Sequence, residues 1–237
     1  MLIPRGNLIF ATGGISDPTE IANLDMWYRA DLGVTGDPVT AWADQSGNSR
    51  DLDTVAGTPD FLSNEINGHP AIDFVPNEML RDATVFTTSF PTHVFMVVRP
   101  DAYTSSKRFL DMATDGTGAK PSFVGDGDSI VGHGVSSGNI DADATGAPAV
   151  GNWGMIHGVW GFDGSNGDIK TAWDDGSYTT AASGALTASN GIALGAMGSF
   201  ELHSDCAISE VIVYSAELVD SDLTNLLGYL QTRYALW

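Results

Sequence analysis

The chain has almost no cysteine. Its 237 residues include a single one, Cys206, so no intrachain disulfide can form and multi-cysteine zinc sites are excluded. Cys206 precedes the apolar residues Ala207 and Ile208, which predicts a buried, inert thiol. The five histidines, at positions 69, 93, 133, 157 and 203, show no metal-ligand spacing. We expect them in strands or loops.

Positive charge is also scarce. Ten Lys and Arg residues stand against 30 Asp and Glu residues, which gives a formal net charge of −20 at pH 7. So acidic a chain repels the phosphate backbone of nucleic acids and the anionic surface of membranes, so neither is an expected partner. Only six of the acids are Glu, and Asp favours turns, helix caps and cation sites over helix interiors.

Long apolar runs are missing as well. No stretch approaches the ~18 apolar residues of a membrane helix. The first eleven residues are too few and too interrupted for a signal peptide. We therefore expect synthesis in a host cytoplasm without a signal peptide.

What the chain does contain is a series of short strand patterns separated by turns. Apolar residues make up 43% of the chain, and there are 28 glycines. Strands are predicted at 24–28, 71–74, 92–99 and 207–214, with Pro100 ending the third, and 153–181 reads as a β-meander. At least ten such strands predict an all-β fold, a two-sheet antiparallel sandwich.

A helix is expected near each end of the chain. Asp17 as N-cap and Pro18 at the first helical position predict a short N-terminal helix. A second helix is predicted from about 222 to 234, capped by Asp220 or Ser221. Its apolar residues fall on one face, which we expect to pack on the sandwich: Leu223, Leu226, Leu227, Leu230 and Tyr234. Without any linker pattern, the chain divides into an arm, 1–15, and one domain, 16–237.

Several segments in order carry a family resemblance. The segments 24–31, 39–48, 67–74 and 207–218 resemble the laminin G-like, concanavalin A-like jelly-roll superfamily, in the branch found in bacterial surface proteins and phage virions. The likeness covers about 24–237 and implies a jelly-roll fold. It implies little about function, because that fold hosts lectins, glycosidases, adhesins and structural modules.

The N-terminal arm resembles the short arms of phage virion proteins that carry this domain. Its apolar and basic residues are candidates for docking on a neighbouring subunit: Leu2, Ile3, Arg5, Leu8, Ile9 and Phe10. An additional edge strand of the same domain is the alternative. If the arm docks, the expected partners are a major capsid protein or other virion proteins.

Catalytic motifs are absent from the sequence. The resemblance implies that an active glucanase of this fold would carry Glu-x-Asp-x-x-Glu, and none of the six glutamates has Asp two positions later. No Gly-x-Ser-x-Gly elbow, phosphate loop or dinucleotide fingerprint occurs. The pairs Asp126/Asp128 and Asp141/Asp143 lie in glycine-rich stretches and read as solvated loops. We expect a non-enzyme with no required cofactor.

Two loops carry oxygen ligands of the kind that Ca²⁺ prefers. They are Asp163, Asn166 and Asp168 in one loop, and Asp44, Asn48 and Asp51 in the other. Neither matches an EF-hand, and Asp and Asn are also ordinary turn residues. Ca²⁺ is thus a candidate ligand, and turn formation is the alternative.

Three tryptophans are candidates for stacking on sugar rings: Trp153, Trp160 and Trp173. The alternative for each is a core position, and Trp27 and Trp42, which belong to the family motif, are expected there.

These observations predict a structural protein on the surface of a bacteriophage virion, a capsid decoration protein docked through its arm. Such modules often form symmetric homo-oligomers, and a trimer is our expectation. The alternative is a glycan-binding adhesin or a tail or fibre receptor-binding module that recognises host surface glycans. A degenerate hydrolase is the third reading.

Overall fold

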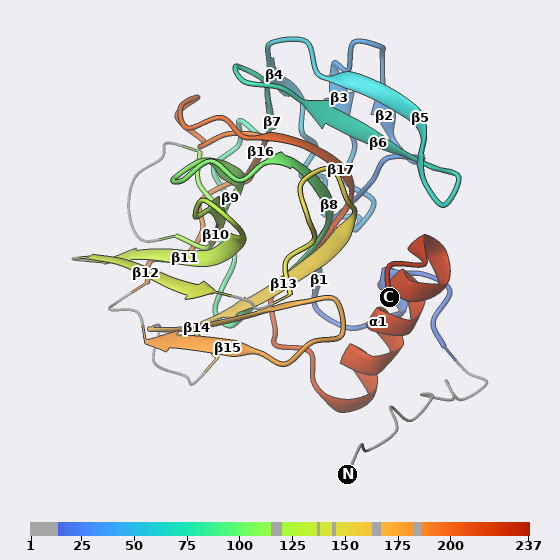
Figure 1. The fold of residues 1–237 in the computed structure, drawn as a ribbon. Helices are drawn as coiled ribbons and strands as arrows, with labels where there is room; N and C mark the ends of the chain where they lie inside the picture. Colours follow the sequence, from blue (N-terminus) through green and yellow to red (C-terminus); the bar gives the residue numbers. More distant parts are fainter. Residues whose placement is uncertain (1–13, 115–119, 137, 144–145, 163–166, 183–185) are drawn as a thin grey trace.

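The computed structural model describes residues 14–114, 120–136, 138–143, 146–162, 167–182 and 186–237. Two antiparallel sheets face each other across a shared core (Figure 1). This arrangement confirms the predicted all-β, jelly-roll-like sandwich. No helix in these ranges is both long and apolar enough to cross a membrane.

The first sheet, called sheet I, has eight strands in the order β15-β14-β13-β8-β17-β6-β5, with β1 paired to β17 beyond the end of β6. Its strands are β1 (Leu24–Arg29), β5 (Asp60–Ile66), β6 (His69–Phe74), β8 (Thr92–Ala102), β13 (Gly154–Trp160), β14 (Asp168–Trp173), β15 (Thr179–Ala182) and β17 (Asp205–Tyr214).

The second sheet, sheet II, has seven strands in the order β12-β11-β10-β9-β16-β7-β4. Its strands are β4 (Thr54–Ala56), β7 (Met79–Arg81), β9 (Arg108–Asp111), β10 (Ser122–Gly125), β11 (Ile130–Ser136), β12 (Gly138–Asp143) and β16 (Ala193–Leu194). A separate hairpin joins β2 (Val34–Thr35) to β3 (Ala41–Trp42).

The core lies between the two sheets. It is built from alternate residues of the strands, which is why the short period-two patterns in the sequence predicted it. Its largest fully buried side chains include Tyr28, Trp42, Phe74, Phe109 and Trp160. Cys206 is also fully buried there, as predicted, and burial raises the pKa of its thiol.

The long central strand β8 departs from its predicted end. It continues through Pro100 to Ala102, although Pro100 was expected to stop it. The last residue of β8 that pairs with β13 is Val98. Pro100 accepts from the Gly151 N–H on that side, so its missing N–H leaves no strand partner unsatisfied.

Both helices pack on the outer face of sheet I. The 3₁₀ helix η1 (Pro18–Glu20) begins as predicted, with Asp17 accepting from the Thr19 N–H at 2.9 Å. Helix α1 (Asp220–Tyr234) covers Phe95, Val97 and Ile212 with the predicted apolar face.

The start of α1 corrects one expectation. Val219 is the N-cap, and its apolar side chain cannot accept a capping bond. Asp220 and Ser221, the predicted caps, already lie inside the first turn. Asp220 and Asp222 instead place negative charge at the positive end of the helix dipole.

Candidate functional site

The sequence-predicted tryptophans divide between core and surface. Trp160 is fully buried and donates from Nε1 to the His133 carbonyl oxygen at 3.0 Å, and Trp173 is 2% exposed. A sugar cannot reach either ring, which corrects the expectation that they bind glycans. Their strands β13 and β14 direct both rings inward. Trp153 is half-buried beside Arg99, whose Cζ lies 5.6 Å from the ring centroid, and it stays a candidate.

In the structure, the first calcium-ligand set acts as a loop scaffold. The Asp44 carboxylate accepts from the backbone N–H groups of Trp27, Ser46 and Arg50 at 2.9–3.2 Å. Asp51 accepts from the Asp44 N–H, and Asn48 donates to the Leu24 and Asp25 carbonyls. These bonds fold the turn after β3 against β1.

The second calcium-ligand set is only partly described. Asp163 and Asn166 lie outside the described residues, and Asp168 is the first residue of β14. Where placement is described, no three His, Cys, Asp or Glu side chains gather in a way that could hold a metal ion. Calcium binding therefore stays a prediction.

The arm residues Leu2, Ile3, Arg5, Leu8, Ile9 and Phe10 lie outside the described ranges as well. Docking through the arm, and the trimer that accompanies it, stay predictions of the sequence.

The outer face of sheet II presents an unforeseen set of polar side chains. Neither helix packs over this face, since both lie against sheet I. Strand register places five residues in one row across β11, β10, β9, β16 and β7. The row runs His133, Ser122, Asp111, Ala193, Arg81.

A bulge in β9 places Arg108 beside this row. Leu110 pairs with Phe123, but Arg108 pairs with Val124, so Phe109 is an extra residue in the strand. Phe109 and Leu110 both point into the core. Arg108 and Asp111, three residues apart, consequently share the outer face, which an unbulged strand would not allow.

A pocket of about 490 Å³ opens on this face. Arg108 and His133 contribute to its walls and are 8% and 3% exposed. Asp126 and the hydroxyl residues Ser105 and Ser106 are exposed at its edge. Apolar side chains complete the lining: Val124, Val131 and Leu202. We call this concavity the sheet II pocket.

Asp111 links sheet II to the turn that contains the pocket residue Leu202. It is 5% exposed and accepts from the Gly198 N–H at 3.0 Å. Burial raises the pKa of Asp111, while the Gly198 N–H and the Arg108 charge partly offset that rise. Asp111 therefore holds the 197–202 turn against the sheet.

The pocket combines donors, acceptors and apolar surface within one concavity. Guanidinium and hydroxyl groups can bind the hydroxyls of a small polar ligand, a carboxylate can accept from them, and the three aliphatic side chains can contact its C–H surface. Sequence patterns missed Arg108, Asp111 and His133. The one sequence signal that falls on the pocket was the Asp126/Asp128 pair, which was interpreted from the sequence as a solvated loop.

The pair Asp141/Asp143 lies in strand β12 and not in the loop that the sequence predicted. Alternating Gly-Asn-Ile-Asp-Ala-Asp residues pair with β11 in regular antiparallel register. Partnering by β11 thus overrides the weak intrinsic strand preference of Gly and Asp.

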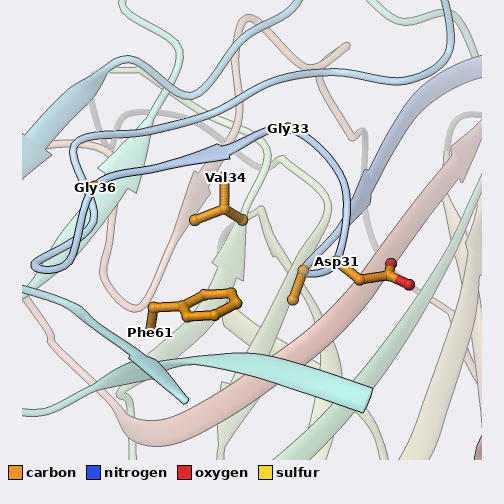
Figure 2. Close-up of a pocket in the computed structure, with 6 residues that line it drawn as sticks. Asp31, Gly33, Val34, Gly36 and Phe61 are labelled. Atoms are coloured by element: carbon orange, nitrogen blue, oxygen red, sulfur yellow. The ribbon is translucent and has the colours of Figure 1, made fainter. Parts of the chain in front are cut away.

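A second, smaller pocket of about 210 Å³ lies between the β2–β3 hairpin and strand β5. Figure 2 shows the Phe61 ring facing Val34 across it, with the Asp31 carboxylate turned away from both. Asp31 is already paired with Arg29 and Arg233. This β5 pocket therefore offers mostly apolar and backbone surface.

A buried polar cluster lies under the segment that leads to α1. The His93 Nδ1 accepts from the Leu218 N–H at 3.2 Å, so the proton of neutral His93 is on Nε2. That Nε2 lies 3.3 Å from the His157 Nδ1, and the Tyr178 hydroxyl lies within 3.2 Å of both. Burial lowers the pKa of His93 well below its usual range and that of His157 to about 3. The cluster is closed to ligands, because both imidazoles are buried.

Comparison with known proteins identifies the fold of this chain but no protein family. No protein-family model matches the chain, and no match is found among curated proteins. Among solved structures, the chain is similar to domain 4 of AbnA, a GH43 extracellular arabinanase from Geobacillus stearothermophilus, in complex with arabinotriose. That similarity has a TM-score of 0.64 and 19% identity, and covers 86% of this chain and 98% of that one.

Two further structures are each about twice as long as the similar region. A mutant GH54 α-L-arabinofuranosidase soaked with 4-nitrophenyl α-L-arabinofuranoside gives a TM-score of 0.60 at 13% identity, covering 83% of this chain and 51% of that one. A structure of botulinum neurotoxin type C, whose cell entry depends on interaction with two ganglioside molecules, gives a TM-score of 0.60 at 13% identity, covering 88% of this chain and 51% of that one. At these identities the likeness establishes the fold alone.

Proposed function

We propose that the chain is a carbohydrate-binding β-sandwich module that holds a glycan in the sheet II pocket. The observation that carries this proposal is the convergence of Arg108, His133, Asp126 and two serines on one concavity of the face that the helices leave open. A hydroxyl-rich ligand matches that lining. The same reading is supported by two similar solved structures, an arabinanase domain in complex with arabinotriose and a botulinum neurotoxin binding domain in complex with SialylT.

We propose that the chain binds a glycan and does not cleave it. The glutamate motif of the glucanases of this fold is absent from the sequence. The similar solved structures include both binding domains and an arabinofuranosidase, so cleavage is tested separately. Incubation with arabinan and with sialylated oligosaccharides should release no product that chromatography detects.

Capsid decoration through the arm, which was the main prediction from the sequence, is now the alternative to glycan binding. It rests on residues outside the described ranges, and no contact in the described residues favours it. Binding of a glycan and attachment to a virion are compatible, since the arm and the sheet II pocket are different parts of the chain.

The binding experiment begins with a glycan array that includes arabino-oligosaccharides and sialylated glycans. The strongest ligand is then titrated by calorimetry into the wild type and Arg108→Gln. Loss of a charge-assisted hydrogen bond costs about 1.5–3 kcal/mol, which corresponds to roughly 10- to 100-fold in Kd.

Two further variants separate binding from folding. Asp126→Asn changes an exposed side chain of the same pocket and should weaken binding without lowering the melting temperature. Asp60→Asn removes one exposed carboxylate from β5 of sheet I and should leave Kd unchanged. Equal affinity of all four proteins, or no glycan bound by the wild type, would refute the proposal.

A further inference from the structure

Phe200 is a solvent-exposed aromatic side chain in the turn that leads to Leu202, a lining residue of the sheet II pocket. Among described residues, the exposed large hydrophobics are Val75, Val85, Val150, Phe200, Val219 and Trp237, and Phe200 is 40% exposed. Its neighbour Leu202 lines the pocket and accepts from the Arg108 N–H through its carbonyl at 2.8 Å. The turn that carries the exposed ring therefore leads directly into the pocket lining.

The turn that carries Phe200 has an unfavourable backbone conformation. Phe200 has φ +63° and Leu202 has φ +52°, a region that bulky residues seldom adopt. Two backbone bonds close the turn, from the Phe200 N–H to the Met197 carbonyl and from the Met197 N–H to the Glu201 carbonyl, at 2.8 and 2.9 Å. The ring is thus held outward although the backbone conformation is disfavoured.

Two charged residues of the sheet II row, buried Asp111 and half-buried Arg81, fix this turn in place. Asp111 accepts from the Gly198 N–H, and Arg81 donates from Nη1 to the carbonyls of Gly198 and Thr114. A Cβ at position 198 would lie 2.0 Å from the Ala113 carbonyl oxygen, so only glycine fits this close approach. The turn is therefore tied to the sheet at both the N–H and the carbonyl of one residue.

The ring itself is supported by His203. The two rings meet edge to face with centroids 4.6 Å apart and planes at 81°. The backbone of His203 in turn forms an isolated parallel β-bridge with the backbone of Arg108, whose side chain contributes to the pocket wall. Contact with His203 restricts the Phe200 side chain, so little rotamer entropy remains to be lost when a ligand packs on it.

We propose that Phe200 is a stacking platform for a second sugar unit, next to the unit held in the sheet II pocket. The inference rests on the proposed glycan binding and specifies a ligand of at least two sugar units. One face of a sugar ring presents C–H groups, and these are attracted to the negative face of an aromatic ring. The polar pocket binds the hydroxyls of the first sugar unit, and Phe200 would add affinity only for an oligosaccharide that reaches its ring.

The test compares a monosaccharide with its trisaccharide, both taken from the strongest ligand on the array. Calorimetry on the wild type and on Phe200→Ala should give a trisaccharide Kd weakened by about tenfold and a monosaccharide Kd within about twofold. Phe200→Trp should retain trisaccharide binding, and its indole fluorescence should change on addition of the trisaccharide. Val150→Ala, another exposed apolar truncation, should change neither Kd.

Phe200→Leu keeps the apolar bulk without the ring, which separates stacking from any effect of truncation on the turn. It should weaken trisaccharide binding as Phe200→Ala does. Two results would overturn the platform while the proposed function stands: wild-type trisaccharide affinity in both Phe200→Ala and Phe200→Leu, or equal weakening of both sugars. A wild type that binds neither sugar would instead refute glycan binding itself.

Discussion

The position of a single extra residue decides what the open face of sheet II presents. If Phe109 were not an extra, bulged residue in β9, the side chains of Arg108 and Asp111 would lie on opposite faces of sheet II. A sequence pattern of alternating residues cannot reveal such a bulge, because both Phe109 and Leu110 are apolar and each suits an inward position. This is why Arg108 was not among the residues that the sequence singled out, although its identity as one of ten cations was visible.

The buried histidines give a prediction at the same scale. His157 stays neutral in the folded protein because burial lowers its pKa to about 3, with the Lys170 charge acting in the same direction. Unfolding exposes it and restores a pKa near 6.5. Its contribution to stability is therefore complete above pH ~6.5 and is lost, by about 1.4 kcal/mol per pH unit, as pH falls towards 3.

His157→Asn should remove this dependence. Denaturant unfolding of wild type and variant between pH 7 and 4 should give a free-energy difference that shrinks as pH falls. The quantity compared is the difference in unfolding free energy between the two proteins, because Asp73 and Asp174 make the stability of each depend on pH in the opposite direction. Burial raises the pKa of each to about 6, so their contribution is lost as pH rises through 6 and is common to both proteins. A difference that is constant with pH would contradict the neutral, buried His157.

Among the elements, helix α1 shows how a polar group can fix a helix onto a sheet. The Glu210 carboxylate of β17 is fully buried between them. It accepts from Trp27 Nε1 at 2.6 Å and from the Tyr229 and Tyr234 hydroxyls at 2.9 and 2.8 Å. Burial raises the pKa of Glu210, and the three donors partly counteract that effect. The apolar face of α1 was readable from its spacing, but this buried acceptor was not.

Glu210→Ala leaves three buried donors without their acceptor. We expect a loss of about 3–5 kcal/mol in the free energy of unfolding. Tyr229→Phe, which removes one of the three bonds, should cost about 1 kcal/mol. Chemical denaturation followed by tryptophan fluorescence measures both.

Glu217→Ala is the matched control for Glu210. Glu217 pairs with Lys170 nearer the surface, and such pairs contribute less than about 1 kcal/mol. If Glu210→Ala cost no more than Glu217→Ala, the buried acceptor would not be what holds α1 on sheet I.

At the scale of the whole molecule, the fold could be predicted from the sequence, but the candidate site could not. Turn signals between short apolar alternations predicted two antiparallel sheets, and Leu226, Leu230 and Tyr234 predicted the covering helix. Both depend on local periodicity. The sheet II pocket depends on strands β9, β10 and β11 meeting in a particular register, and on the 197–202 turn returning to their edge. Those are long-range facts that residue types alone do not encode.

The net charge of −20 also belongs to this scale. On that charge, nucleic acids and anionic membranes were excluded as expected partners from the sequence. The structure adds that a cation, Arg108, is embedded in the wall of the sheet II pocket within this acidic molecule. Recognition of a hydroxyl-rich ligand uses such a group as a hydrogen-bond donor, independently of the overall charge.

Nuclear magnetic resonance mapping of the bound glycan tests the proposed function most directly. The array-selected oligosaccharide is titrated into ¹⁵N-labelled protein, and the shifts of the backbone amides are followed. The amides of Ser105, Ser106, Gly125 and Leu202, which line the sheet II pocket, should shift most. Shifts centred on Gly33, Val34 and Gly36 would place the ligand in the β5 pocket, and unchanged amides throughout would contradict glycan binding by this chain.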